Sequence, residues 1–329
     1  MIKFAMFGAG RIARVHGQTL TEHPDVSLEF VIDPVAEAAE SVAKEFGAQV
    51  TDAESVFANK DIDAVLICSS TDTHADLLEK SARAGKAIFC EKPVDLDTSR
   101  AKDVAQIIKE CGVPCFIGFN RRFDPTFQSL WDQKKEGRIG NLEQLVITSR
   151  DPSPPPASYV KVSGGLFRDM MIHDLDMARW MLGEEPVEIF ATGSCLVDPE
   201  IGEAGDVDSA HVIMKTASGK LCHINNSRRA AYGYDQRIEA FGEKGMLQAG
   251  NHRASEVRFV GDEGDTIEKP LFFFLERYMP AYRRELQEFV DTLLKGQEPT
   301  ATIEDGVRAL ELADACVESM KTGKAVRLD

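Results

Sequence analysis

Asp169 and His173 form the pair of side chains in this sequence whose types and spacing could remove a proton from an alcohol. They stand four residues apart at the expected start of a helix, a spacing that places both on one face within hydrogen-bonding reach. The carboxylate would hold one tautomer of the imidazole and raise the basicity of its other nitrogen. Alcohol oxidation needs such a proton acceptor while hydride leaves the carbon. An Asp–His pair on a helix is more often structural than catalytic, so the rest of the chain must support this interpretation.

A glycine-rich turn near the beginning of the chain could bind the phosphates of a dinucleotide. Gly8-Ala9-Gly10-Arg11-Ile12-Ala13 follows the first expected strand and opens the first expected helix. The first glycine permits a tight turn, the second lets the backbone approach a pyrophosphate, and the alanine allows close packing of helix on strand. The helix N-terminus adds free N–H groups and the positive end of its dipole. We assign Gly8, Gly10, Arg11 and Ile12 to the cofactor site, although Arg11 is equally well explained as a solvated surface cation.

Asp33 indicates which dinucleotide binds. It ends the second expected strand, twenty residues after Ala13, where an acid would hydrogen-bond the adenosine ribose. The same carboxylate would repel a 2′-phosphate, and residues 34–38 contain no compensating cation. NAD is therefore favoured over NADP. The alternative is that Asp33 only caps the turn before Pro34.

Two further loops follow strands of the same expected sheet at their carboxyl ends, where open α/β sheets bind ligands. The first loop is rich in Ser, Thr and Asp, which are also the preferred types for capping the next helix. The second is Glu91-Lys92-Pro93, whose lysine is not explained by packing but could be an ordinary surface residue. From these loops we assign six residues to the cofactor site: Ser69, Ser70, Thr71, His74, Glu91 and Lys92.

The elements that must position these residues alternate regularly in the first 120 residues. Apolar strand-like runs at 3–7, 28–32, 64–68, 87–90 and 115–118 are separated by helical patterns such as 35–46, 73–83 and 98–109. Continuous apolar strands between helices predict a parallel sheet covered on both faces, the doubly wound Rossmann arrangement. We therefore expect a NAD-binding domain over residues 1–120.

The pattern changes in residues 121–329, which we expect to form a second, substrate-binding and oligomerisation domain. After a polar helix at 125–136, alternating strands at 142–149, 187–192, 209–216, 220–226 and 237–241 predict a large open, mostly antiparallel sheet with one solvated face. The segment 151–158 holds four prolines and is expected to be a stiff loop without regular structure. Amphipathic helices at 281–294 and 303–321 close the chain.

Composition excludes several classes of partner. The chain has 329 residues, enough for two domains, and a net charge of −16, which argues against nucleic acid and anionic membranes. No signal peptide or apolar run of about 18 residues is visible, so we expect a soluble, cytoplasmic protein. The seven scattered cysteines form no zinc set, and we expect reduced, mostly buried thiols and no metal.

Taken together, the glycine turn, Glu91-Lys92-Pro93 and the segment from Gly164-Gly165 through Asp169 to His173 resemble the glucose-fructose oxidoreductase / inositol dehydrogenase / MocA family. The order and spacing of these motifs match over nearly the whole chain. The resemblance implies that Lys92, Asp169 and His173 form the catalytic triad. It also implies that the final helix packs back towards the first domain and that the protein is a homo-oligomer, a tetramer.

Further segments resemble the bacterial inositol 2-dehydrogenases within that family. They are Gly118 to Pro125, Ser149-Arg150-Asp151-Pro152, Val162 to Gly165 and Tyr232-Gly233-Tyr234-Asp235. This likeness implies NAD-dependent oxidation of myo-inositol to 2-keto-myo-inositol, with Arg121, Tyr232 and Tyr234 near the polyol or the nicotinamide; we assign them, with the triad, to the substrate site. Some relatives carry a histidine where Ser149 stands, so a contact to one ring hydroxyl would differ.

Two other functions stay open at this point. One is a dehydrogenase of the same family acting on another polyol or sugar, such as scyllo-inositol or glucose. The other is a sugar sensor that binds NAD without turnover, since fold alone does not fix function. The presence of Lys92, Asp169 and His173 argues against a sensor, which has no need for a positioned base.

Overall fold

The structure is a computed structural model that describes residues 1–328, and it divides into two compact units. The first unit comprises residues 1–123 and 279–310, and the second comprises residues 124–278 and the chain from 311 onward. The first unit therefore combines an N-terminal segment with a later one.

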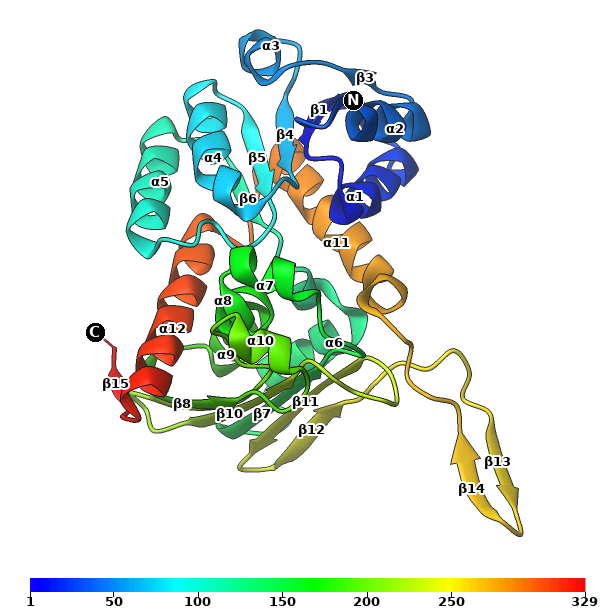
Figure 1. Cartoon of the computed structure of the whole chain (residues 1–329), viewed down its shortest axis with the longest axis vertical. Helices are drawn as coiled ribbons and strands as arrows, with labels where there is room; N and C mark the ends of the chain where they lie inside the picture. The colour runs from blue at the N-terminus through cyan, green and yellow to red at the C-terminus, as the bar shows by residue number, and fades with distance from the viewer. Residues whose placement is uncertain (329) are drawn as a thin grey trace. The chain divides into compact units, whose positions relative to one another are not determined.

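A six-stranded parallel sheet forms the centre of the first unit (Figure 1), as the apolar runs predict. Its strand order is β3-β2-β1-β4-β5-β6, in which the chain reverses direction along the sheet between β1 and β4. Ligands bind at such a switch point in doubly wound sheets. The strands are β1 (Ile2–Phe7), β2 (Val26–Ile32), β3 (Gln49–Val50), β4 (Ala64–Ile67), β5 (Ala87–Cys90) and β6 (Cys115–Ile117). The sequence pattern missed β3, whose two residues are exposed and carry no apolar run.

Helices separate the strands of the first unit. They are α1 (Arg11–Glu22), α2 (Ala36–Phe46), α3 (Ala53–Ala58), α4 (His74–Arg83) and α5 (Thr98–Cys111), with short 3₁₀ turns η1 (Thr71–Thr73) and η2 (Asn120–Phe123). Aspartates cap α3 and α5, and Gly47 and Gly112 end α2 and α5 in the left-handed conformation. The helix α11 (Phe274–Lys295) contributes Phe289, which packs on Phe4 and Phe89 of the sheet.

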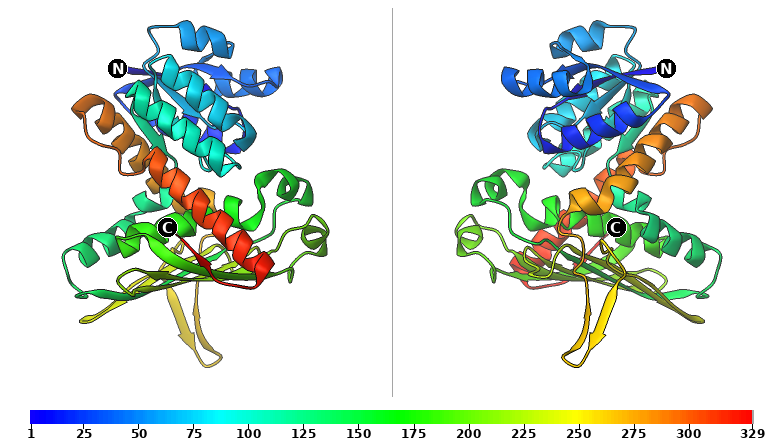
Figure 2. Two further views of the ribbon diagram at one scale, coloured as in Figure 1. Left: turned by 90° about the vertical axis from the view of Figure 1, so that its left-hand side faces the viewer. Right: turned by 90° about the vertical axis from the view of Figure 1, so that its right-hand side faces the viewer.

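The second unit contains a seven-stranded sheet in the order β12-β11-β7-β10-β9-β8-β15. Its strands are β7 (Leu142–Arg150), β8 (Pro186–Ser194), β9 (Ser209–Thr216), β10 (Leu221–Ser227), β11 (Asp235–Gly242), β12 (Gly245–Ala249) and β15 (Val326–Arg327). All pairs are antiparallel except β7 with β10, which run parallel, so the expected mostly antiparallel sheet is confirmed. Buried and exposed residues alternate along β9, and helices of this unit cover one face of the sheet (Figure 2).

The helices of the second unit are α6 (Pro125–Lys135), α7 (Ala157–Ser163), α8 (Gly165–Asp169), α9 (Ile172–Leu182) and α10 (Pro199–Glu203). A hairpin of β13 (Arg258–Gly261) and β14 (Gly264–Ile267) stands apart from the large sheet, and α12 (Ile303–Thr322) precedes β15. The expected irregular segment 151–158 is two residues too long, because α7 begins at Ala157 directly after the last proline. Proline is tolerated just before a helix, so the proline run ends where the helix can start.

Across residues 1–328 the structure contains no helix long and apolar enough to cross a membrane. All seven cysteines are free thiols; five are buried, Cys195 is partly buried and Cys111 is exposed. The prediction that the thiols are mostly buried is therefore confirmed.

Candidate active site

The glycine turn has the geometry that its sequence predicts. Gly8 has a φ of +102°, and a Cβ there would lie 2.5 Å from the carbonyl oxygen of Cys68, so both conformation and space require glycine. At Gly10 an added Cβ would meet nothing within 4 Å. Ala13 is fully buried, which fits the close packing of α1 against the sheet. The protein itself therefore needs Gly8, while the space over Gly10 is open to a ligand.

The N-terminus of α1 is open in the same way. Its capping residue is Gly10, which has no side chain to accept a hydrogen bond from the first turn of the helix. The first N–H groups of a helix have no partner within the helix and favour an anion such as a phosphate. Ile12 lies in this turn and is partly buried, and Arg11 is exposed beside it. These observations fit a dinucleotide pyrophosphate at the start of α1.

Asp33 is tied to the glycine turn by hydrogen bonds. Its Oδ2 accepts from the backbone N–H of Ala9 at 2.8 Å, and its Oδ1 accepts from the N–H of Val35 at 2.8 Å. The second contact is the turn cap that was the alternative explanation, and the first joins the residue after β2 to the glycine turn. An ionised carboxylate has about four acceptor sites, so the two contacts leave capacity for a ribose hydroxyl. Both explanations of Asp33 therefore hold together.

The loop after β4 is organised around a buried histidine. The ring of His74 lies between two carbonyl oxygens, with Nδ1 2.7 Å from that of Pro93 and Nε2 3.1 Å from that of Ser69. Burial lowers the pKa of His74, which favours its neutral form. Ser69 also bonds its hydroxyl to that of Thr73 at 2.7 Å, while Ser70 is exposed and Thr71 partly buried. A neutral ring has one N–H, and the shorter distance assigns it to the carbonyl of Pro93, so His74 ties the loop after β4 to the turn after β5.

The two sequence neighbours of Lys92, Glu91 and Pro93, each contact the ring of a buried histidine. Before it, the Glu91 carboxylate is 2.7 Å from Nε2 of His16, a residue of α1 that the sequence analysis did not single out. After it, the carbonyl of Pro93 faces His74, and the Lys92–Pro93 peptide bond is cis. The backbone N–H of Glu91 also donates to Ile67 of β4. The position of this turn is therefore fixed on both sides of the lysine.

Asp169 and His173 lie on two short helices rather than on one. Asp169 is the last residue of α8, and His173 is the second residue of α9. The expectation of a single helix start is therefore wrong, because α8 ends at Asp169 and a turn at Met170 and Met171 precedes α9. Both methionines keep right-handed helical backbone angles, so the chain continues in the same sense between the two residues. The later positions Leu175, Ala178 and Leu182 are buried, as expected.

Two side chains from other elements hold the carboxylate of Asp169. The hydroxyl of Tyr159, in α7, donates to Oδ1 at 3.0 Å, and the guanidinium of Arg228, just after β10, lies 3.4 Å from Oδ2. Arg228 is 1% exposed, so its charge is shielded from water. Neither residue was predicted, although Arg228 stands at the end of an expected strand, where a buried cation is unusual. The carboxylate of Asp169 is consequently fixed within the second unit by one hydrogen bond and one ion pair.

Asp206 supports the start of α8, the helix that ends at Asp169. Its Oδ2 accepts from the N–H of Leu166, in the first turn of α8, and a Cβ at Gly165 would lie 2.7 Å from Oδ1. Burial raises the pKa of Asp206, and the positive charge of Arg228 partly opposes that shift. Gly165, the first residue of α8, therefore makes room for an acid that caps this helix.

The three residues expected near the polyol differ in burial and in hydrogen-bond partners. Arg121 is 4% exposed in η2 of the first unit. Tyr232 is 40% exposed; its hydroxyl donates to Asp235 at 2.5 Å and accepts from Arg150 at 3.0 Å. Tyr234 is buried against Phe273 and Tyr278. The hydroxyl of Tyr232 thus already has two partners within the second unit.

Ser149 lies in a buried polar cluster beneath α9. Its hydroxyl is 2.5 Å from Asp174 and 2.9 Å from Gln236, and Asn226 donates to the other oxygen of Asp174 at 2.9 Å. Asp174 comes directly after His173, so the cluster anchors the start of α9 to strands β7, β10 and β11. A histidine in place of Ser149 would have to displace these partners.

The three residues of the expected triad come from both units. Lys92 belongs to the first unit, whereas Asp169 and His173 belong to the second. The structure places Glu91 and Lys92 in one turn, which His74 of α4 contacts through the carbonyl of Pro93, and it brings Asp169 together with Tyr159 and Arg228. The roles of the triad residues remain predictions.

Family profiles match both parts of the chain. The profile described as "Oxidoreductase family, NAD-binding Rossmann fold" matches residues 2–119. The profile described as "Oxidoreductase family, C-terminal alpha/beta domain" matches residues 133–328. Both profiles describe the GFO/IDH/MocA family. Together they match nearly all of the sequence.

Full-length relatives agree with these profiles. The chain is 48% identical over 327 residues to an inositol 2-dehydrogenase of Rhizobium meliloti, with 99% of each chain covered. A crystal structure of a myo-inositol dehydrogenase from Corynebacterium glutamicum is 45% identical, covers 100% of this chain and 99% of its own, and superposes with a TM-score of 0.96. A scyllo-inositol dehydrogenase from Lactobacillus casei, solved with NAD(H) and scyllo-inositol, is 30% identical, with 99% of each chain covered and a TM-score of 0.92.

Proposed function

Since the chain belongs to the GFO/IDH/MocA oxidoreductase family, we propose that it oxidises myo-inositol to 2-keto-myo-inositol with NAD as the hydride acceptor. The observation that carries the substrate is the full-length similarity to inositol 2-dehydrogenases, at 48% identity for the Rhizobium meliloti relative. The motifs and the fold are those of the same family over the whole chain.

The geometry of the first unit supports NAD as the cofactor. The uncapped N-terminus of α1 and the open space over Gly10 suit a pyrophosphate, and Asp33 has acceptor capacity for the ribose. An added 2′-phosphate would meet the negative charge of Asp33. Bound NAD supplies the acceptor for the hydride, and the protein supplies the groups that bind it and move the proton.

In the proposed mechanism, His173 takes the hydroxyl proton of the polyol as the carbon–hydrogen bond breaks. Asp169 orients His173 and stabilises its protonated form, while Tyr159 and Arg228 fix the Asp169 carboxylate. Lys92 hydrogen-bonds the reacting oxygen and stabilises developing alkoxide character with its charge. His16 contacts Glu91 and His74 contacts Pro93, so both neighbours of Lys92 are fixed in place. This supports the proposed role, because the ammonium group must keep its position relative to the reacting oxygen.

Arg121, Tyr232 and Tyr234 are proposed to contact the polyol. Arg121 carries a buried guanidinium, which suits hydrogen bonding to hydroxyl groups in a dry site. Tyr232 would have to exchange its bond to Asp235 or Arg150 for a substrate hydroxyl, or contact the polyol through its ring. Replacing each of the three should raise the inositol KM while NADH binding, followed by fluorescence, stays near normal.

The open face of the second unit's sheet supports a homo-oligomer, which we propose to be a tetramer acting in the cytoplasm. Side chains on this face include the exposed Phe190, Ile213 and Phe241. Exposed apolar residues grouped on one face are typical of surfaces that are covered by another subunit. Light scattering of the purified protein measures this state.

A rate panel tests the proposed function. Initial rates are measured with NAD and with NADP against myo-inositol, scyllo-inositol, glucose and xylose. We expect the highest kcat/KM for myo-inositol with NAD. A higher value for another polyol would reassign the substrate, and NADH binding without turnover of any polyol would favour a sensor.

A further inference from the structure

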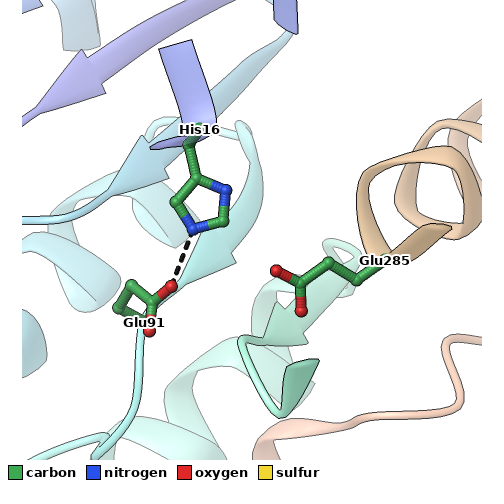
Figure 3. A group of neighbouring side chains, drawn as sticks. All are labelled: His16, Glu91 and Glu285. Carbon is green, nitrogen blue, oxygen red and sulfur yellow. Dashed lines mark hydrogen bonds and ion pairs between the residues drawn. The ribbon is translucent and has the colours of Figure 1, made fainter. Parts of the chain in front are cut away.

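Three titratable side chains of the first unit meet in its interior: His16 of α1, Glu91 after β5 and Glu285 of α11 (Figure 3). One ligating atom from each lies within 4.8 Å of the others. Glu285 is completely buried, and neither of its carboxyl oxygens has a hydrogen-bond partner. Figure 3 shows its side chain directed from α11 towards the His16–Glu91 pair. A buried, ionised carboxylate without a partner would raise the free energy of the folded state strongly. A proton or a cation must therefore neutralise Glu285.

A proton fits this space better than a metal ion. Nε2 of His16 and Oε1 of Glu91 are 2.7 Å apart, the length of a hydrogen bond. A tetrahedral ion with ligand bonds of about 2.1 Å would hold two ligand atoms roughly 3.4 Å apart. The His16–Glu91 pair is therefore already closed by a proton, and within residues 1–328 the cluster offers three protein ligands. A carboxyl group beside a carboxylate keeps its own proton because two like charges cannot share a dry site.

The surroundings of Glu285 favour its neutral form. The titratable groups around it are His16, the Glu91 carboxylate and the thiol of Cys68 at the end of β4. Burial, and then the negative charge of Glu91, raises the pKa of Glu285 well above its usual value. The aromatic rings of Phe89 and Tyr282 pack edge-on against His16, which keeps the cluster dry.

We propose that Glu285 is a positioning residue for Lys92: it stays protonated in the folded protein, closes the remaining gap of up to 4.8 Å by a rotation of its side chain, donates its hydroxyl hydrogen to the Glu91 carboxylate and thereby fixes the turn that carries the lysine. The inference rests on the proposed role of Lys92. Glu91 would then accept one hydrogen bond from His16 and one from Glu285, so its carboxylate is held from two elements. Little room remains for it to move, since a Cβ at Gly118 would lie 3.1 Å from its carboxyl carbon.

Infrared spectroscopy tests the proton directly. The full-length protein, labelled with ¹³C at glutamate carboxyl groups, is compared with E285Q at neutral pH. We expect a carbonyl stretch of a protonated carboxyl group in the wild type that is missing in E285Q. Identical spectra without this band would overturn the proposal. So would a stoichiometric divalent cation that survives dialysis in the wild type and is lost in E285Q, because the cluster would then be a metal site.

Kinetics test the positioning. E285Q, whose amide can still donate to Glu91, should keep kcat and its pH profile. E285L cannot donate, and because misplacing an acting group by ~1 Å can cost up to about a hundredfold in rate, its kcat should fall at least tenfold while NADH still binds. Thr292→Val is the matched control: it removes another buried, unpaired polar group from α11, and kcat should not change.

Each outcome decides. A folded E285L with wild-type kcat and pH profile would reduce Glu285 to a buried structural residue. If circular dichroism shows that E285L is unfolded, E285Q decides alone, and a folded E285Q with a tenfold lower kcat would contradict the neutral-donor role. A wild-type enzyme that does not turn over inositol would refute the proposed function, whereas the infrared band would still report the proton of Glu285.

Discussion

The two units hold their key aspartates in different ways. Asp33 of the first unit accepts hydrogen bonds from the backbone N–H groups of Ala9 and Val35, both in turns of the same sheet edge. Asp169 of the second unit is held by the side chains of Tyr159 and Arg228, which come from separate elements. A backbone contact depends on the fold alone, whereas a side-chain contact can be lost by one substitution. The binding function of the first unit should therefore tolerate change at its supporting residues better than the chemistry of the second.

His173→Ala should have the largest effect. A secondary alcohol is far too weak an acid to ionise at neutral pH, and loss of a positioned base should lower kcat by about 10²–10⁴-fold. NADH binding, followed by fluorescence, should remain, because the cofactor site is built in the first unit. His23→Ala is the control, since this histidine directly follows α1 and its Nε2 lies 3.0 Å from the side-chain oxygen of Gln287, outside the residues assigned to the site. A His173→Ala enzyme with most of its kcat and an unchanged pH profile would place the base elsewhere.

Lys92→Ala should also lower kcat strongly, by about 10²–10³-fold, because it removes the charge that stabilises the developing alkoxide. Lys92→Arg should recover only part of the rate, since a planar guanidinium does not replace a compact ammonium. Steady-state rates with saturating inositol and NAD measure both variants. Full recovery in Lys92→Arg would mean that charge alone, without position, is sufficient.

Asp33→Ala should change cofactor choice rather than chemistry. Loss of a hydrogen bond to a charged acceptor should lower kcat/KM for NAD by about ten- to a hundredfold and narrow its advantage over NADP. The ratio of kcat/KM for the two cofactors measures this effect. If the wild type already used NADP as well as NAD, the assignment of Asp33 to the ribose would be wrong.

Stability should depend on pH through Glu285. Because burial and Glu91 raise the pKa of Glu285, folding favours its protonated form. That stabilisation is complete below the unfolded-state pKa and is lost as pH rises towards the folded-state pKa. Glutamine does not titrate, so the Tm of E285Q relative to the wild type should increase between about pH 5 and pH 8. Parallel Tm profiles for the two proteins would show that Glu285 has no raised pKa.

Tyr159→Phe should have the smallest effect. It removes one neutral donor to Asp169 and leaves Arg228 in place, so a loss of about 1 kcal/mol, or roughly fivefold in kcat, is expected. The guanidinium of Arg228 should keep the carboxylate ionised and close to its place, because a pair of opposite charges holds more strongly than a neutral donor. Steady-state kinetics with saturating inositol measure the effect. An unchanged kcat would mean that Asp169 is oriented without the help of Tyr159.

The same contrast explains what could be predicted from the sequence. The first unit follows from local patterns: apolar strands, helix caps and a glycine turn whose requirements lie within a few residues, as at Gly8. The ion pair of Asp169 with Arg228, the support of α8 by Asp206 and the approach of Glu285 to Glu91 depend on residues far apart in the chain. Periodicity carries no information about such contacts. The inositol specificity rested on resemblance from the start and is supported by the relatives, not by the geometry.

Transfer of deuterium from myo-inositol labelled at C2 tests the central claim most directly. The labelled polyol is incubated with NAD and the wild-type enzyme, and the reduced cofactor is analysed by mass spectrometry and NMR. We predict reduced cofactor carrying one deuterium at C4 of the nicotinamide, with the label lost from the inosose. Unlabelled NADH would show that another carbon is oxidised, and the absence of any reduced cofactor would contradict the assignment of this chain as an inositol dehydrogenase.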